Sequence, residues 1–389
     1  MKKNRFLSWL KVNRLTVAVL LFCTALFAVM YIYANGRYEK AALSKQDSYR
    51  VYETARVLSI LSDDSEKSVD FENKYIGSQS VQIEITSGDY KGLTMAATNY
   101  LGALYGSHLK AGDSIIVVIS IEENEVSNVV VYEYNRLTPI LFLIALFFLV
   151  TIWIGGKKGA QSLLGLVITI LCLIFILIPL LMTGAPTLPT VFAICLYVAL
   201  FSFTLIGGIT KKTLCAMLGT VFGIGLPILF GMLAQKMLRV DGMRMGDYVD
   251  ALLQLKKAGM EIKLSGLLLG GMIISALGAV MDVAMSISSA LWEITSVNPD
   301  LTRKEIWKSG MNIGRDMIGT MTNTLILAFV GSSFLLVIYL WSLELPFYEL
   351  FSSSLVATEL IHGIASSMGI IFSVPFTVFI GTRMFYQKK

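Results

Sequence analysis

The sequence is poor in charged residues. Asp, Glu, Lys and Arg make up 15% of its 389 residues, whereas soluble domains average about 25%. Hydrophobic residues make up 55%. A purely water-soluble globular protein does not fit this composition, so the lipid bilayer is the expected solvent for most of the chain.

Histidine and cysteine are scarce as well. The chain has two histidines and four cysteines. The cysteines lie far apart inside apolar runs, and none belongs to a CxxC pair. The sequence therefore predicts neither a disulfide framework nor a zinc site. The signatures HExxH, GxSxG and the P-loop are also absent, so we expect no cofactor, no catalytic residue and no enzyme of a soluble type.

Long uncharged apolar runs are abundant, and each is long enough to cross a bilayer, which takes roughly 20 residues. They predict eight transmembrane helices, at Leu15–Ala34, Leu137–Gly156, Leu163–Met182, Leu188–Ile209, Thr213–Ala234, Leu264–Leu291, Met317–Leu343 and Leu360–Thr382. The expected fold class is a polytopic α-helical membrane protein. The first run is longer than a cleavable signal core, so it is interpreted as a signal anchor, although cleavage stays open.

Residues 35–136 have no such run. This stretch holds 15 of the 27 acidic residues and 10 of the 32 basic ones. Val, Ile, Tyr and Thr gather in five segments that predict strands at Arg50–Leu61, Val81–Thr86, Lys91–Thr98, Ile115–Ile121 and Val126–Tyr134. We expect a small, OB-like β-barrel. The acidic segment Ser62–Lys74 is predicted to be a solvated loop, and the net negative charge argues against nucleic-acid binding.

Charge placement predicts the orientation. Residues 1–14 are basic, and further Lys and Arg residues flank the spans on the same side. The positive-inside rule therefore places both termini in the cytoplasm and the β domain, residues 35–136, outside a bacterial cell membrane. The remaining divisions are the anchor at 15–34, four spans within 137–234, an outer amphipathic segment at 235–263 and three spans within 264–389.

One acid lies deep inside a predicted span. An ionisable side chain at such depth is expensive and therefore marks a functional site. Asp282 begins a polar stripe that continues along one helical face through Ser286, Ser289 and Glu293. The next helix carries Arg315, Asp316, Thr320, Asn323 and Thr324 at helical spacing. Counted along the helices, Asp282 and Asn323 have similar depth, so we expect a hydrogen bond between them.

Three interpretations of this polar cluster stay open. It is an ion-responsive centre, a clasp that only joins two helices, or an intramembrane aspartyl hydrolase that uses Asp282 and Asp316. An amide or a hydroxyl would make a clasp without the cost of a buried acid, which favours the ion-responsive interpretation. Small residues in the same region predict close helix packing. They are Gly266, Gly270, Gly278, Gly319 and Gly369.

The segments GAVMDVAMSISSALWE at 278–293 and GRDMIGTMTNTLILA at 314–328 closely resemble the YibE/F family of bacterial membrane proteins. The order of anchor, β-rich domain and hydrophobic bundle is similar to the longer YibE type. The resemblance implies a multi-span membrane protein, often paired with a shorter companion of YibF type. It implies no established activity.

Residues 264–382 are more distantly similar to the second membrane segment of SecF-like proteins of the RND permease superfamily. This likeness implies coupling roles for Asp282, Arg315, Thr320 and Asn323. The β-rich domain and the two extra spans before the motif depart from that pattern.

The expected function is therefore that of a transporter or transport-accessory protein. Its expected partners are the lipid bilayer and either a YibF-type companion or a second copy of the chain, and not nucleic acid. The rival hypothesis is a non-transporting assembly or regulatory protein that acts through the β domain.

Overall fold

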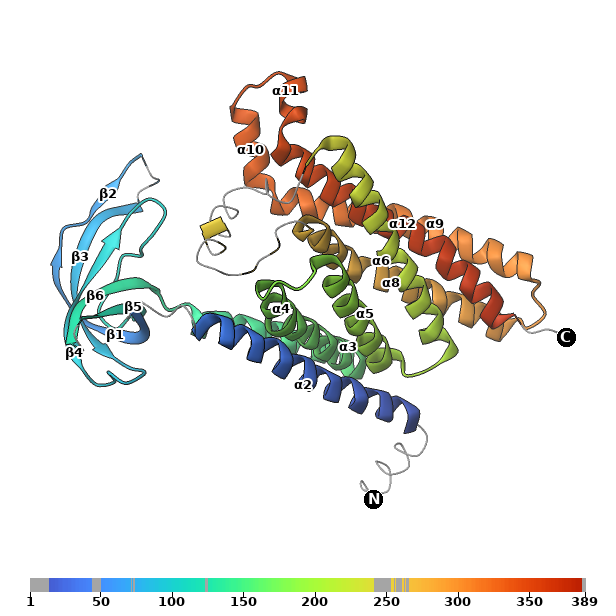
Figure 1. Cartoon of the computed structure of the whole chain (residues 1–389), viewed down its shortest axis with the longest axis horizontal. Coiled ribbons are helices and arrows are strands. Elements are labelled where there is room, and N and C mark those ends of the chain that lie inside the picture. Colours follow the sequence, from blue (N-terminus) through green and yellow to red (C-terminus); the bar gives the residue numbers. More distant parts are fainter. Residues whose placement is uncertain are drawn as a thin grey trace. The chain divides into compact units, whose positions relative to one another are not determined.

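The computed structural model describes residues 14–43, 50–70, 72, 74–122, 125–240, 253–254, 256, 261, 263 and 266–386. The chain divides into two compact units, a β unit within residues 46–153 and a helical unit formed by residues 1–45 and 154–389. The secondary-structure elements of both units are labelled in Figure 1.

The β unit is a small barrel. Its strands are β1 (Arg50–Asp63), β2 (Glu66–Ser68), β3 (Lys74–Ile85), β4 (Thr94–Leu101), β5 (Ser114–Glu122) and β6 (Glu125–Tyr134). Antiparallel pairing joins β1 to β3, β3 to β4, β5 to β6 and β1 to β5. A parallel contact between Thr98 and Val130 joins β4 to β6 and so closes the ring of five long strands.

Alternating side chains fill the interior of this barrel. In β3, for example, Val81, Ile83 and Ile85 are buried while the residues between them are exposed, as the two-residue period of a strand requires. The five predicted strands are confirmed. The acidic segment, however, is not one loop: β1 extends to Asp63, and β2 pairs with the first residues of β3.

The helical unit begins with α2 (Arg14–Leu43) and continues with α3 (Leu137–Cys172), whose first part belongs to the β unit. A short π-helical turn, η1 (Leu173–Leu177), leads into α4 (Ile178–Met182). The later helices are α5 (Thr187–Gly207), α6 (Lys211–Leu238), α8 (Leu267–Val297), α9 (Arg303–Ser332), α10 (Phe334–Ser342), α11 (Phe347–Ser352) and α12 (Ser354–Phe385).

Helices α6, α8 and α12 pack against one another and form the centre of the bundle, and α9 lies along α12 (Figure 1). Small residues allow this close approach. A Cβ atom added at Gly369 of α12 would lie 2.8 Å from Pro227 Cγ and 2.9 Å from the carbonyl oxygen of Gly223, both on α6. Glycine is therefore required where these two helices meet.

The first helix is tied to the bundle by polar contacts as well as apolar ones. The Tyr197 hydroxyl of α5 donates to the carbonyl oxygen of Cys23, 2.9 Å away. The Asn35 amide donates to the carbonyl oxygen of Phe175 within η1, at 2.8 Å. A π-helical turn changes the backbone hydrogen-bond pattern, so this carbonyl group is available to a side chain.

Six helices in the described residues are long and apolar enough to cross a membrane, or seven if the bent pair α9–α10 is one span. The sequence predicts eight. The difference lies in Leu137–Met182, which the structure contains as 46 continuous helical residues. Gly156, at φ 56° and ψ −136°, interrupts the helical backbone within α3.

The predicted amphipathic segment at 235–263 is only partly described. Helix α6 extends through its first residues to Leu238. Most of the remaining segment, including Tyr248, Val249 and Leu252, lies outside the described residues.

Candidate functional site at helices α8 and α9

The polar stripe of α8 lies on a face that the described residues leave uncovered. Asp282, Ser286 and Glu293 are exposed, and Ser289 is half-buried. The opposite face, with Val283, Ile287 and Leu291 among its residues, is fully buried in the bundle. The helix thus separates an apolar side that packs inward from a polar side that points away from the bundle.

The polar residues of α9 are exposed too. Arg315, Asp316, Thr320, Asn323 and Thr324 all lie on uncovered surface. Their recorded contacts stay within α9: the Arg315 guanidinium donates to Asn312 Oδ1 at 3.3 Å, and the Thr320 and Thr324 hydroxyls donate to backbone carbonyls of their own helix.

The predicted hydrogen bond between Asp282 and Asn323 is not formed in the described chain. The reason is helical phase. Helix α9 packs through Gly310 and Gly314, where an added Cβ would meet Val378 and Val374 of α12 first, and then Leu291 Cδ2 at 3.0 Å and Ile287 Cδ1 at 3.5 Å, both of α8. Asn323 follows Gly314 by nine residues, which at 3.6 residues per turn is about 180° around the helix. Its side chain therefore points away from the side on which α9 packs against α12 and α8.

The predicted packing glycines fall into two groups, those with close neighbours in the chain and those without. Gly270 approaches α5, where an added Cβ would lie 3.2 Å from Val191 Cγ2, and Gly266 and Gly369 also face close neighbours. An added Cβ at Gly278 or Gly319 would meet no atom within 4 Å. These two glycines lie one helical turn before Asp282 and Asn323, on the same uncovered faces.

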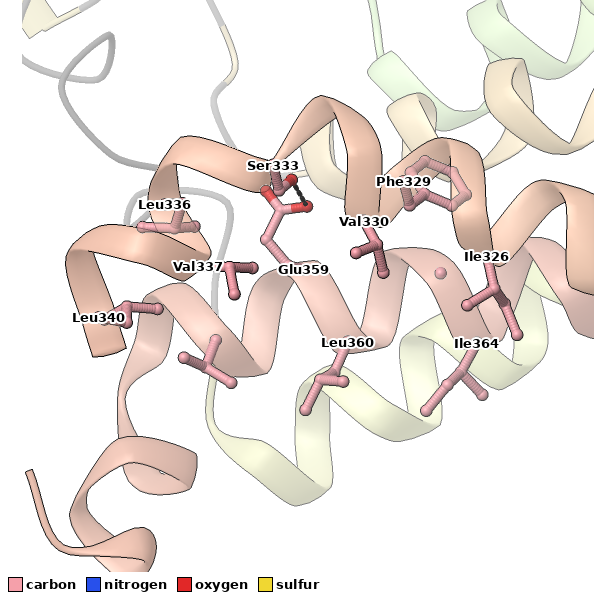
Figure 2. A pocket seen from close by; sticks show the side chains of 12 residues that line it. Ile326, Phe329, Val330, Ser333, Leu336, Val337, Leu340, Glu359, Leu360 and Ile364 are labelled. Carbon is pink, nitrogen blue, oxygen red and sulfur yellow. Dashed lines mark hydrogen bonds between the residues drawn. The ribbon is translucent and has the colours of Figure 1, made fainter. Parts of the chain in front are cut away.

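A second feature of the helical unit is a broken helix. Helices α9 and α10 meet at Ser333 at an angle of 62°. The Ser333 hydroxyl donates to Glu359 Oε2 of α12 at 3.1 Å (Figure 2). Beside this bond is a cavity of about 310 Å³. Apart from the Ser333–Glu359 pair it is lined by apolar residues, namely Ile326, Phe329, Val330, Leu336, Val337, Leu340, Val356, Leu360, Gly363 and Ile364.

A histidine lies one turn along α12 from this cavity. His362 Nε2 is 3.1 Å from the Ser275 hydroxyl of α8, and Ser275 is 2.9 Å from the Ser366 hydroxyl. Glu359, three residues earlier, bonds to Ser333, whereas the half-buried His362 bonds to α8.

The β unit holds a charged cluster around Asp63. Asp63 Oδ2 lies 2.9 Å from His108 Nε2 and accepts a hydrogen bond from the Gln79 amide at 3.0 Å. Hydrogen bonds from Ser65, Gln79 and His108, the Ser65 hydroxyl first among them, lower the pKa of Asp63 to about 2. Among the described residues, no group of three or more His, Cys, Asp or Glu side chains is arranged to hold a metal ion.

Sequence reasoning missed the broken helix and its cavity. The break lies inside one of the predicted spans, where hydropathy stays high on both sides. The three residues Gly331, Ser332 and Ser333 are the available signal, because adjacent Gly and Ser residues favour kinks in long helices.

The apolar helices are consistent with a multi-pass membrane protein. A family model described as YibE/F-like protein matches residues 143–387, more than half of the chain. The chain therefore belongs to the YibE/F-like family, as its two motif segments indicate. Neither the curated proteins nor the solved structures contain a match to it.

Proposed function

We propose that this protein is a transporter or transport-accessory protein of the bacterial cell membrane and that Asp282 is its ion-responsive group. The observation that carries the proposal is the position of Asp282, in the middle of α8 on an uncovered face and without a hydrogen-bond partner in the described chain. A carboxyl group in such a place is costly and is kept where protons or ions are handled.

The uncovered faces of α8 and α9 also favour a protein partner. Polar groups at membrane depth do not face lipid, so the stripes of α8 and α9 need cover from another protein surface or a water-filled path. Gly278 and Gly319 add close-approach sites that the described part of the chain leaves unused. A YibF-type companion, or a second copy of the chain, would supply the helix that packs there.

The broken helix gives independent support. Discontinuous helices in transporters place polar groups and irregular backbone beside the substrate path. The bend at Ser333 places a hydroxyl against the Glu359 carboxylate at the edge of an apolar cavity. Asp282 and this cavity would then be the ion-responsive and substrate-facing parts of one helical unit.

The proposed arrangement has eight spans, both termini in the cytoplasm and the β domain outside. At about 1.5 Å per residue, the 46 residues of Leu137–Met182 would be roughly 69 Å long, over twice the hydrocarbon thickness of about 30 Å. Division at Gly156 gives two spans, and the bent pair α9–α10 counts as one. If Lys389→Cys reacted with an impermeant reagent in intact cells while Gly88→Cys did not, this topology would be inverted.

We assign no catalytic residue. An intramembrane aspartyl hydrolase needs two carboxyl groups that share a substrate. Asp282 lies on α8, and Asp316 lies about 200° around α9 from the Gly314 contact with α8. These positions favour two separate surfaces over one catalytic pair.

An assembly or regulatory role through the β domain is the second candidate function. A surface of exposed tyrosines on this domain favours it. The two functions differ in what they require of Asp282, because a binding protein that acts through its β domain does not need a titrating acid inside the bilayer.

The test is reconstitution into liposomes that contain a pH-sensitive dye, with and without the YibF-type companion. We expect proton flux for the wild-type protein and its loss for Asp282→Asn, since the amide keeps the shape but cannot titrate. Asp89→Asn, in an exposed turn of the β domain, is the matched control and should leave flux unchanged. Equal flux in Asp282→Asn and wild type would remove the ion-coupling proposal.

A further inference from the structure

The outer surface of the β barrel carries a row of exposed tyrosines. Tyr52, Tyr100, Tyr105 and Tyr132 are 57%, 55%, 63% and 60% exposed. They come from β1, β4, the segment after β4, and β6. The Thr98–Val130 contact brings the neighbouring strand positions of Tyr100 and Tyr132 together, and the rings of Tyr52 and Tyr132 meet edge to face at 5.3 Å.

These four tyrosines line a groove of about 600 Å³, together with Gly106, three valines, Ser120 and Asn128. We call it the tyrosine groove. Exposed aromatic rings gathered in one hollow are a feature of binding surfaces, because each offers a flat apolar face and a hydroxyl group at its edge.

A second hollow adjoins the groove and shares Tyr105 and Gly106 with it. We call it the basic hollow. It measures about 480 Å³ and is lined by Lys74, His108 and Arg136 among others, with Glu133 as its one acid.

The cations of the basic hollow are held in place. Arg136 donates to Glu133 Oε1 at 3.1 Å and to the Ser107 hydroxyl at 3.3 Å. Lys74 donates to the carbonyl oxygen of Ala103 at 3.2 Å and forms no ion pair within the described residues. A positive charge without an acidic partner therefore faces this hollow in a domain that is acidic as a whole.

The wall between the two hollows is shaped before any ligand arrives. Gly106 has φ +76°, and an added Cβ there would collide with the carbonyl oxygen of Tyr100. At Gly102 an added Cβ would lie 2.6 Å from Tyr105 Cζ, so this ring rests directly on the backbone. Glycine at both positions fixes Tyr105 as a platform, and a preformed site loses little conformational entropy on binding.

We propose that the tyrosine groove and the basic hollow form one binding site for an oligosaccharide that bears acidic groups. The apolar C–H face of a pyranose ring stacks on a tyrosine ring while its hydroxyl groups bond to the phenol edges. Lys74 and Arg136 then bind a carboxylate or phosphate substituent. Small five-stranded barrels are established binders of oligosaccharides.

Other occupants fit less well. A single-stranded nucleic acid would also stack on aromatic rings, but it carries a phosphate beside every base, and among the described residues no Lys or Arg lines the tyrosine groove where those bases would stack. A proline-rich peptide would use the tyrosine groove and leave the basic hollow without a role. This site is independent of Asp282 and goes beyond the transport proposal.

The test uses the full-length purified protein and isothermal titration calorimetry. The acidic probes are hyaluronan, polygalacturonate and alginate tetrasaccharides, and chitotetraose is the neutral probe. We expect saturable binding of at least one acidic probe, with weaker binding of chitotetraose. Tyr132→Ala should lower the affinity at least tenfold, and Lys74→Ala should remove the preference for the acidic probe.

Three variants guard against a folding artefact. Tyr132→Phe keeps the ring and should retain most of the affinity. Tyr348→Ala removes a tyrosine that is 76% exposed in α11, and Lys91→Ala removes an exposed lysine in a β-domain turn, so both should bind as the wild type does.

Three results would overturn the proposal. They are the absence of saturable binding of all three acidic probes, affinities that Tyr132→Ala leaves unchanged, and Tyr132-dependent binding of a proline-rich decapeptide in place of the sugars.

Discussion

The Gln79 cluster of the β unit and the polar stripes of α8 and α9 differ in how their polar groups are satisfied. In the β barrel, the buried Gln79 accepts hydrogen bonds from the Asn99 amide at 3.1 Å and from the Leu109 N–H at 2.9 Å. In the helical unit, Asp282 and Asn323 have no hydrogen bond within the described chain and lie on uncovered faces. Polar groups that satisfy one another maintain a fold, whereas the unsatisfied ones on α8 and α9 are, in the proposed membrane arrangement, completed by something outside the chain.

The largest expected effect concerns the buried hydrogen-bonded cluster of Gln79, Asn99 and Leu109. Gln79→Leu removes the acceptor that Asn99 and the Leu109 N–H share, so two buried donors lose their partner. We expect the β unit to lose about 3 kcal/mol of stability, measured by hydrogen exchange in β3 and β4 of the full chain. Gln82→Leu, exposed in the same strand, should change it by less than about 0.5 kcal/mol. Equal effects would contradict the role of the cluster.

Substitutions at two glycines compare helix packing within the bundle, at Gly369, with the proposed packing against a partner, at Gly278. Gly369→Ala places a Cβ against Pro227 and the Gly223 carbonyl, so thermal unfolding in detergent should show a loss of about 2 kcal/mol. Gly278→Ala has open space and should be neutral or slightly stabilising. Gly278→Leu should weaken cross-linking to a companion or second copy while leaving the melting temperature near that of the wild type. Unchanged cross-linking would place the partner elsewhere.

The stability of the β unit should depend on acid pH through Asp63, in a range that the polar residues of the helical unit do not set. The pKa of Asp63 is lowered from 3.8 to about 2, so the ionised carboxylate stabilises the folded state. This contribution is complete above about pH 4 and is lost as the pH falls through the folded pKa. Asp63→Asn should remove that part of the pH dependence of β-unit unfolding. A wild-type profile in the variant would show that the contact contributes nothing.

The smallest expected effect is the absence of energetic coupling between Asp282 and Asn323. Because Asp282 and Asn323 point to different sides of the α8–α9 pair, Asp282→Asn and Asn323→Ala should change the stability of the purified single chain additively, within about 0.5 kcal/mol. A coupling energy above about 1 kcal/mol in a double-mutant cycle would restore the direct contact that similar depth predicts.

The sequence predicts the five long strands and the apolar helices because each follows from a period or a length that is local to its segment. Composition does not predict β2, because this strand lies in a segment rich in charged residues and pairs only with the first residues of β3. The break at Ser333 leaves no change in hydropathy. Local patterns therefore locate the elements but not their interruptions.

Residue counting predicts a depth for the candidate site but not the direction of its side chains. Counting residues places Asp282 and Asn323 at similar levels, but rotation about the helix axis depends on which residues pack. Gly310 and Gly314 are fixed against Val378 and Val374 of α12. These contacts join positions 68 and 60 residues apart, and no pattern within either helix specifies them.

The most direct test of the central claim is infrared difference spectroscopy of the purified protein in lipid between acidic and alkaline buffer. If Asp282 titrates, the wild-type spectrum contains the carbonyl band of a protonated carboxylic acid that Asp282→Asn lacks and the control Asp89→Asn retains. Identical carboxylic-acid bands in all three proteins would contradict the assignment of Asp282 as the ion-responsive group.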